Sequence, residues 1–358
     1  MPCRSILLPL HFQKGMVMLM KTSMPRLVKN TLIILAIFCG AFAVINLICY
    51  IGAGRPLFNT ILDVRNFLRT SSINFCIALA LSFNLTNGRF DLSLGAQRMV
   101  ATVIGGNIAL QLGLGSFGIV VFAILVGILA GALVGVVYVT FRIPPMVLGI
   151  GMALVYECVA FAFSPSGLIL YGVDSIQSLF GIGYPLATVV VFSVIFFVML
   201  RYTKFGYRTR AIQGSQRLSR NAGINVSGNA VLCYTLGGGV VAVSGIYDAA
   251  LKGRFESLLG FSSCTPIWSS CFPMFLGTYL AKWTNLPLGI LIATIIVNFL
   301  KTGLSVLQFS TNAQSAIELS AFLLFLVIRS NEGLFRQIKQ RKARIDLAMQ
   351  EKMGQQSA

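Results

Sequence analysis

Long apolar runs, separated by short polar joins, fill most of this 358-residue chain. A helix needs about twenty apolar residues to cross the hydrocarbon core of a bilayer, and many of the runs have about that length. Pro and Gly mark several of the joins, as in FRIPP and SPSG. The pattern predicts about ten spans, at residues 31–52, 71–87, 96–112, 116–140, 145–164, 183–201, 227–250, 264–281, 286–304 and 314–329. Residues 57–70 mix apolar and charged positions and predict a short amphipathic helix at the membrane interface.

The composition agrees with a membrane protein. Hydrophobic residues make up 56% of the chain and charged residues 11%, whereas a soluble domain carries about a quarter charged residues. We therefore predict an all-α fold, a polytopic transmembrane helical bundle. The expected organisation is a cytoplasmic N-terminal tail at 1–30, a transmembrane domain at 31–330 and a basic cytoplasmic C-terminal tail at 331–358.

The positive charge lies mainly in short loops and tails. The formal net charge is +18, and 22 of the 28 Lys and Arg residues fall in the cytoplasm when both tails are placed there. Cytoplasmic segments of membrane proteins carry such an excess. Membrane topology therefore accounts for the charge, and we expect the lipid bilayer, not nucleic acid, as the partner of this chain.

Patterns that carry enzyme chemistry are missing from the sequence. The only histidine is His11, the eight cysteines form no CxxC pair, and no G-x-x-x-x-G-K-[ST] or HExxH occurs. An intramembrane enzyme is therefore a poor hypothesis, and no metal site is expected. If ATP drives a process here, another subunit must bind it.

One basic loop has a specific pattern, RYTKFGYRTRAIQGSQRLSRNAGINV at 201–226, and its length suits two short helices. Charge alone favours an ordinary solvated loop. The motif T-x-F-G-x-R-x-x-A-I-x-G, however, resembles the cytoplasmic loop of permease subunits in ABC importers for simple sugars, the ribose and galactose transport type. In that family the loop docks on the ATP-binding subunit. The resemblance places Phe205, Gly206, Arg208, Ala211, Gly214 and Gly223 at that contact.

A polar joint between the second and third spans supports the same resemblance. Residues 86–95 read TNGRFDLSLG, similar to the G-G-I-D-L-S-V-G signature of the family. The signature joint comprises Asn87, Asp91, Leu92, Ser93 and Gly95, and Arg89-Phe90 depart from the small and aliphatic pair that the family has. We favour a joint at the inner surface, where Arg89 and Asp91 are solvated and Asp91 caps a helix from about Leu92. Lining of an internal cavity by Asp91 is the alternative.

The resemblance covers residues 31–330, which would then form the permease domain, and implies a function. It implies import of a simple sugar or sugar-like solute across a bacterial cell membrane, with both tails cytoplasmic. The implied partners are an ABC ATP-binding subunit, an extracytoplasmic solute-binding protein and a second permease chain, identical or different. No cofactor is expected on this chain, because ATP and Mg²⁺ would lie on the partner ATPase. Near the eighth span, this chain departs from the Gly-rich run of the family and keeps only Leu276-Gly277-Thr278.

Polar residues within the spans are candidates for lining the solute pathway. They are Asn84, Gln97, Asn107, Glu157, Gln314 and Glu318. Hydrogen bonding between helices is the other role open to them. An ion-coupled secondary transporter is the alternative function, because buried carboxylates bind H⁺ or Na⁺ in such proteins; Glu157, Glu318 and Asp91 are its candidates.

A short repeat connects the two halves of the chain. Residues 88–95 read GRFDLSLG and residues 253–260 read GRFESLLG. Each copy follows the first span of its half, and the expected topology places the copies on opposite sides of the membrane. An inverted repeat of spans 2–5 and 7–10 has this arrangement; a chance match of simple composition is the alternative.

Overall fold

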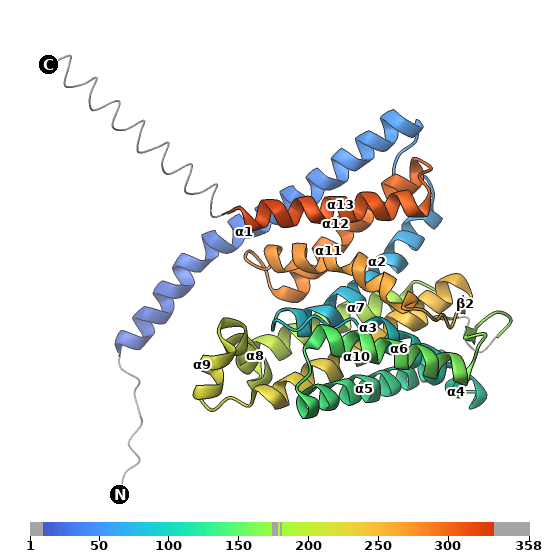
Figure 1. Cartoon of the computed structure of the whole chain (residues 1–358). Coiled ribbons are helices and arrows are strands. Elements are labelled where there is room, and N and C mark those ends of the chain that lie inside the picture. Colours follow the sequence, from blue (N-terminus) through green and yellow to red (C-terminus); the bar gives the residue numbers. More distant parts are fainter. Residues whose placement is uncertain (1–9, 174–177, 180, 333–358) are drawn as a thin grey trace, which may run out of the picture. The chain divides into compact units, whose positions relative to one another are not determined.

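Helices make up nearly all of the regular structure (Figure 1). The structure is a computed structural model that describes residues 10–173, 178–179 and 181–332, with the backbone alone for 10–28. The chain divides into two units, residues 1–308 and 309–358, which we describe separately. The first unit contains α1 (Leu10–Ala53), α2 (Ile61–Leu85), α3 (Leu94–Val100), the π-helical turn η1 (Ala101–Gly105), α4 (Gly106–Gln111), α5 (Gly115–Phe141), α6 (Pro145–Phe163), β1 (Leu168–Ile169), α7 (Gly183–Tyr202), α8 (Lys204–Gly214), α9 (Gln216–Asn221), α10 (Val226–Lys252), β2 (Arg254–Phe255), the 3₁₀ turn η3 (Ser262–Cys264), α11 (Thr265–Leu280) and α12 (Leu286–Val306); the second contains α13 (Thr311–Ser330).

The predicted polytopic helical bundle is confirmed. Among the described residues, seven helices are long and apolar enough to cross a bilayer, namely α1 from Lys29, α5, α6, α7, α10, α12 and α13. The other predicted spans fall on α2, on α3 to α4 and on α11, so the count of ten stays a prediction. The expected N-terminal tail overlaps α1, which begins at Leu10. The expected C-terminal tail lies outside the described residues after 332.

Residues 57–70 do not form a helix of their own. Residues 61–70 are the first part of α2, which continues unbroken to Leu85. A capping box starts the helix, because the Thr60 hydroxyl accepts from the Asp63 N–H and the Asp63 carboxylate accepts from the Thr60 N–H at 2.9 Å. The hydrogen bond from the backbone N–H of Thr60 is the main reason why the pKa of Asp63 lies below its usual value. No Pro or Gly follows to end the helix before the second span, so the predicted short helix was wrong.

Glycines allow α5 and α10 to pack closely side by side (Figure 1). A Cβ on Gly131 would lie 2.3 Å from the carbonyl oxygen of Tyr234, and one on Gly238 would lie 2.2 Å from that of Gly127. Small residues at such spacings let the backbones of membrane helices approach. The pair α5 and α10 is therefore a rigid support for the segments at its two ends.

An aromatic cluster joins α1, α2 and α12. The rings of Phe67 and Phe299 stack with their centroids 5.0 Å apart, and Phe42 and Phe58 pack around Phe299. Interhelical hydrogen bonds add to this contact: Asn74 Nδ2 donates to Asn298 at 2.8 Å. Residues far apart in the chain thus fix α12 against the first two helices.

Two short strands connect loops from the two halves of the first unit. β1 pairs with β2 antiparallel, with Leu168 opposite Phe255 and Ile169 opposite Arg254. The first strand follows α6 and the second follows α10. The pairing holds the loop after α10, which contains the second GRF copy, against the loop after α6.

Candidate functional site

The signature joint is a buried, non-helical stretch between α2 and α3. Asn87, Arg89, Asp91 and Ser93 are each no more than 3% exposed. Gly88 has a φ of 74° and turns the chain after α2, a conformation that glycine adopts without strain. Non-helical backbone in a membrane protein is tolerated where protein surrounds it. The favoured interpretation, a solvated joint, was therefore wrong, because neighbouring helices cover the stretch.

The Asp91 carboxylate is the centre of a polar cluster. Its Oδ1 accepts from the backbone N–H and the hydroxyl of Ser93, at 2.9 and 2.6 Å. Asn84 and Gln97 donate to its Oδ2 at 3.4 and 3.5 Å. α3 begins at Leu94 with Ser93 in the N-cap position. Asp91 thus accepts a backbone N–H just before the helix, but it does not occupy the cap, and the helix starts later than expected.

The basic loop folds into the two short helices α8 and α9, as predicted. The hydroxyl of Thr203 accepts from the Gly206 N–H at the start of α8, and Ser215 caps α9 in the same way. The apolar face of α8 packs on the bundle, where Thr209 donates to Asn229 of α10 at 3.2 Å. The loop is therefore a defined layer at the end of the bundle where α10 begins.

A direct hydrogen bond connects this loop to the signature joint. Gln216 Nε2 of α9 donates to the backbone carbonyl of Asn87 at 2.9 Å. The Asn87 side chain donates in turn to the Phe83 carbonyl in α2 at 2.8 Å. Two stretches separated by more than a hundred residues in the sequence are thus in direct contact.

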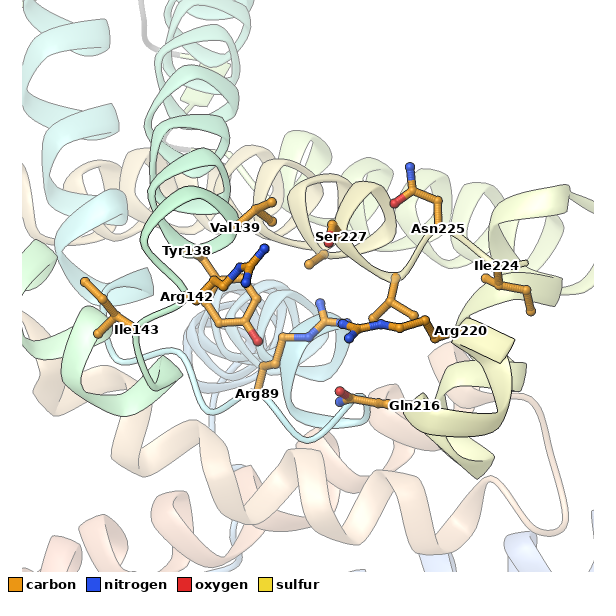
Figure 2. A pocket seen from close by; sticks show the side chains of 12 residues that line it. Arg89, Tyr138, Val139, Arg142, Ile143, Gln216, Arg220, Ile224, Asn225 and Ser227 are labelled. Carbon is orange, nitrogen blue, oxygen red and sulfur yellow. The ribbon is translucent and has the colours of Figure 1, made fainter. Parts of the chain in front are cut away.

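A cavity of about 560 Å³ lies where three of the sequence motifs meet (Figure 2). The signature joint contributes Arg89, the FRIPP turn contributes Arg142, and α9 contributes Gln216 and Arg220. The turn forms because α5 ends at Phe141, Arg142 takes a left-handed φ of 54°, and Pro145 starts α6. The signature joint and the basic loop, which were predicted separately from the sequence, therefore meet at one site together with the FRIPP turn.

The predicted docking residues have different surroundings. Arg208, Gly214 and Gly223 are exposed, whereas Gly206 is buried and a Cβ there would lie 2.1 Å from the Leu200 carbonyl. Phe205 and Ala211 are half-buried. The exposed positions can contact a partner, and the others build the fold of α8.

The predicted pathway residues are only partly brought together. Asn84 and Gln97 meet at Asp91, as described above, whereas Asn107 on α4 donates to the Gly167 carbonyl at 3.1 Å. Glu157 on α6 is 1% exposed, and its two oxygens accept from the N–H groups of Phe261 and Ser263 at 2.8 and 2.9 Å. Gln314 and Glu318 lie on α13 in the second unit, where Gln314 donates to the Phe309 carbonyl.

A buried ion pair that was not expected from the sequence lies at the other end of α10. Arg98, near the start of the predicted span 96–112, lies on α3 at 4% exposure, and its guanidinium binds Asp248 at 2.7 Å. The ring of Phe255 lies 5.1 Å from that guanidinium. One signal was in the sequence, because Asp248 is the sole acid in the seventh span. A second cavity, of about 460 Å³, includes Arg98, Asp248 and Arg254.

The two GRF copies lie at opposite ends of α10. Arg89 shares its cavity with Val226, the first residue of α10, and Arg254 shares the other with Lys252, the last. Gly88 and Gly253 both have a positive φ, 74° and 80°. The inverted repeat stays a prediction, and this placement agrees with it. Among the described residues, no group of three or more His, Cys, Asp or Glu side chains is placed to hold a metal ion.

Comparison with known proteins connects this geometry to a family. A family model described as "Branched-chain amino acid transport system / permease component" matches residues 64–328, most of the chain. The chain belongs to this permease family. It is therefore a multi-pass membrane protein. The matched residues correspond to a permease component, which is a translocation pore and not an enzyme.

Named relatives of this permease are import permeases, and two of the three are named for ribose. The ribose import permease protein RbsC of Escherichia coli (strain K12) is 25% identical over 295 residues, 80% of this chain and 91% of that protein. RbsC of Bacillus subtilis (strain 168) is 27% identical over 304 residues, 81% and 91% of the two chains. The autoinducer 2 import system permease protein LsrD of Yersinia pestis (strain Pestoides F) is 23% identical over 298 residues, 77% and 86%.

Proposed function

We propose that this permease imports a simple sugar or sugar-like solute, driven by a separate ATP-binding subunit. The relatives named above support this class of solute. The proposed complex has a second permease chain, an extracytoplasmic solute-binding protein, and ATP with Mg²⁺ on the ATPase. It lies in a bacterial cell membrane with both tails in the cytoplasm, which agrees with the positive-inside charge distribution.

The hydrogen bond from Gln216 to Asn87 is the observation that carries the proposal. A displacement of α8 and α9 by the ATP-binding subunit is transmitted to the buried joint through this contact. The joint leads directly into α3 and holds the Asp91 cluster. Small rigid-body shifts of packed helices are the usual means by which a partner changes the access of a site. The basic loop therefore acts as the coupling segment between the ATPase and the bundle.

Exposed positions of α8 offer the docking contact. Arg208 is exposed, and no atom lies within 4 Å of the position that a Cβ on Gly214 would take. Neither residue is needed for the packing of α8, which uses Gly206, Thr209 and Ile212. We propose that Arg208 and Gly214 touch the ATP-binding subunit.

Unpaired polar atoms around the joint support a pathway for a hydroxyl-rich solute. In the part of the chain that the structure describes, Asn84 Oδ1, Gln97 Oε1 and Tyr234 Oη are buried without a hydrogen-bond partner. Buried polar groups normally have one. Sugar hydroxyls donate and accept hydrogen bonds, so they would satisfy these atoms during passage. We propose that Asn84 and Gln97 line the solute pathway.

The test is transport by the complex reconstituted in liposomes with its ATPase and solute-binding protein. Arg208→Glu and Gly214→Glu are expected to insert normally but to lose coupled uptake. Arg65→Glu is the matched control, an exposed arginine outside the loop, and is expected to transport normally. Normal, ATP-dependent uptake by both loop variants would contradict the docking assignment. The ion-coupled alternative gains no support from the relatives, and uptake that persists without the ATPase would be needed to restore it.

A further inference from the structure

Three arginines from separate segments line the cavity at the start of α10 (Figure 2). Arg89 comes from the signature joint, Arg142 from the turn after α5, and Arg220 from α9. No acidic side chain among the described residues lines this cavity. Three arginine side chains thus line one space to which the described residues contribute no acidic side chain, and positive charge gathered in this way favours the entry of an anion.

Arg89 is the decisive member of the three. The residue is 2% exposed, and its Nη1 and Nη2 are buried with no hydrogen-bond partner among the described residues. The side chain points into the cavity (Figure 2), with its guanidinium 6.0 Å from the ring centroid of Tyr138. Buried N–H groups of a charged side chain are costly when they have no acceptor. A ligand that accepts from both nitrogens removes that cost.

The start of α10 adds donors and positive potential to the same cavity. α10 is 27 residues long, and its first residues, Val226 and Ser227, line the space together with its N-cap residue Asn225. The first N–H groups of a helix have no partner within the helix, and the helix dipole is positive there. Anions therefore bind readily at such a terminus, and here the buried Arg89 lines the same cavity with two nitrogens that have no partner among the described residues.

We propose that this cavity is a binding site for a phosphate group, held by Arg89, Arg142 and Arg220. The planar fork of a guanidinium matches two phosphate oxygens, and three such groups more than neutralise a divalent anion. A free phosphate and the headgroup phosphate of an anionic lipid offer the same chemistry. Basic pockets between membrane helices also bind anionic headgroups.

A bound phosphate would join three segments of the bundle. Through Arg89 it contacts the joint, through Arg142 the turn between α5 and α6, and through Arg220 the coupling loop. It therefore stabilises the arrangement in which Gln216 reaches Asn87. The site does not depend on the proposed import activity, since its occupation is measured by binding alone.

The first experiment measures the apparent unfolding temperature of the full-length chain in a neutral detergent. Sodium phosphate is titrated while sodium chloride is lowered to keep the ionic strength constant. The wild type is expected to gain a few degrees with saturation, because a ligand that binds the folded state stabilises it. Arg217→Gln is the matched control, an exposed arginine of α9 outside the cavity, and is expected to respond like the wild type.

Arg142→Gln and Arg220→Gln are expected to need about tenfold more phosphate for half of the effect, since a charged hydrogen bond is lost. Both residues are exposed, so these variants test the site even if Arg89→Gln does not fold. An equal response of Arg220→Gln, Arg217→Gln and the wild type would overturn the proposal.

Nanodiscs distinguish the two sources of the phosphate group. If lipid is the source, discs with phosphatidylglycerol raise the unfolding temperature above that in pure phosphatidylcholine, in a manner that requires Arg220, and added phosphate has no further effect. If free phosphate is the source, the saturable effect persists in both kinds of disc. The proposal is wrong if neither disc shows an effect that depends on Arg220.

Discussion

The side-chain amide of Gln216 donates to the backbone carbonyl of Asn87 at 2.9 Å, which joins the basic loop to the buried joint. The two residues come from stretches that each resemble the same transporter family on their own. Because the acceptor is a backbone atom, substitution of Gln216 alone removes the contact. Substitution of Gln216 therefore tests directly whether this hydrogen bond transmits movement of the loop to the bundle.

Gln216→Ala is expected to lower solute uptake per ATP hydrolysed by about threefold or more, because residues along a coupling contact change the coupling by roughly 0.5–2 kcal/mol. Basal ATP hydrolysis by the complex should remain. Gln213→Ala, at an exposed position on α8, is the matched control and should leave coupling unchanged. Equal coupling ratios in the two variants, measured in proteoliposomes, would show that the contact carries no signal.

Glu157→Gln is expected to lower the free energy of unfolding by about 1–3 kcal/mol. Both carboxylate oxygens accept backbone N–H groups, from Phe261 and Ser263, and an amide places a donor against one of them. Glu256→Gln, at an exposed carboxylate, should change stability by less than about 0.5 kcal/mol. The measurement is thermal unfolding in detergent. Unchanged stability together with lost transport would instead place Glu157 in the solute pathway.

Asp248→Asn is expected to cost about 3 kcal/mol or more, because it leaves the buried Arg98 without its charged partner. Lys252 also contacts Asp248, at 3.0 Å, but its side chain is 65% exposed. Lys252→Gln should therefore cost no more than about 1 kcal/mol. Chemical denaturation in detergent compares the two variants, and similar losses would mean that Arg98 finds another partner.

Gly131→Ala is expected to destabilise the bundle by about 1–3 kcal/mol, as overpacking does in a close-packed interior. The new Cβ would lie 2.3 Å from the Tyr234 carbonyl, so α5 and α10 must separate. Gly151→Ala on α6 is the control, because nothing lies within 4 Å of its Cβ position. A matched loss of stability in both variants would point to helix-wide effects and not to the α5–α10 contact.

The helical elements were largely predictable because their signals are local. The length of apolar runs identified α5, α6, α7, α10 and α12, and the basic loop at 201–226 was expected to form the two short helices that are α8 and α9. The start of α2 was missed, because a four-residue capping box decided it and the charged residues after it suggested an interfacial segment. The three motifs of the candidate site were found, but their common cavity was not, since it depends on how distant segments pack.

The sequence by itself determined the membrane class, the family resemblance and the positions of the motifs, because hydrophobicity, charge and motif spacing are properties of short stretches. Only the tertiary structure decided what the joint TNGRFDLSLG does. Helices from both halves of the chain cover it, so Asp91 becomes the centre of a buried cluster and Arg89 a buried cation that faces a cavity. Burial is set by neighbours that are remote in sequence, and no local pattern records them.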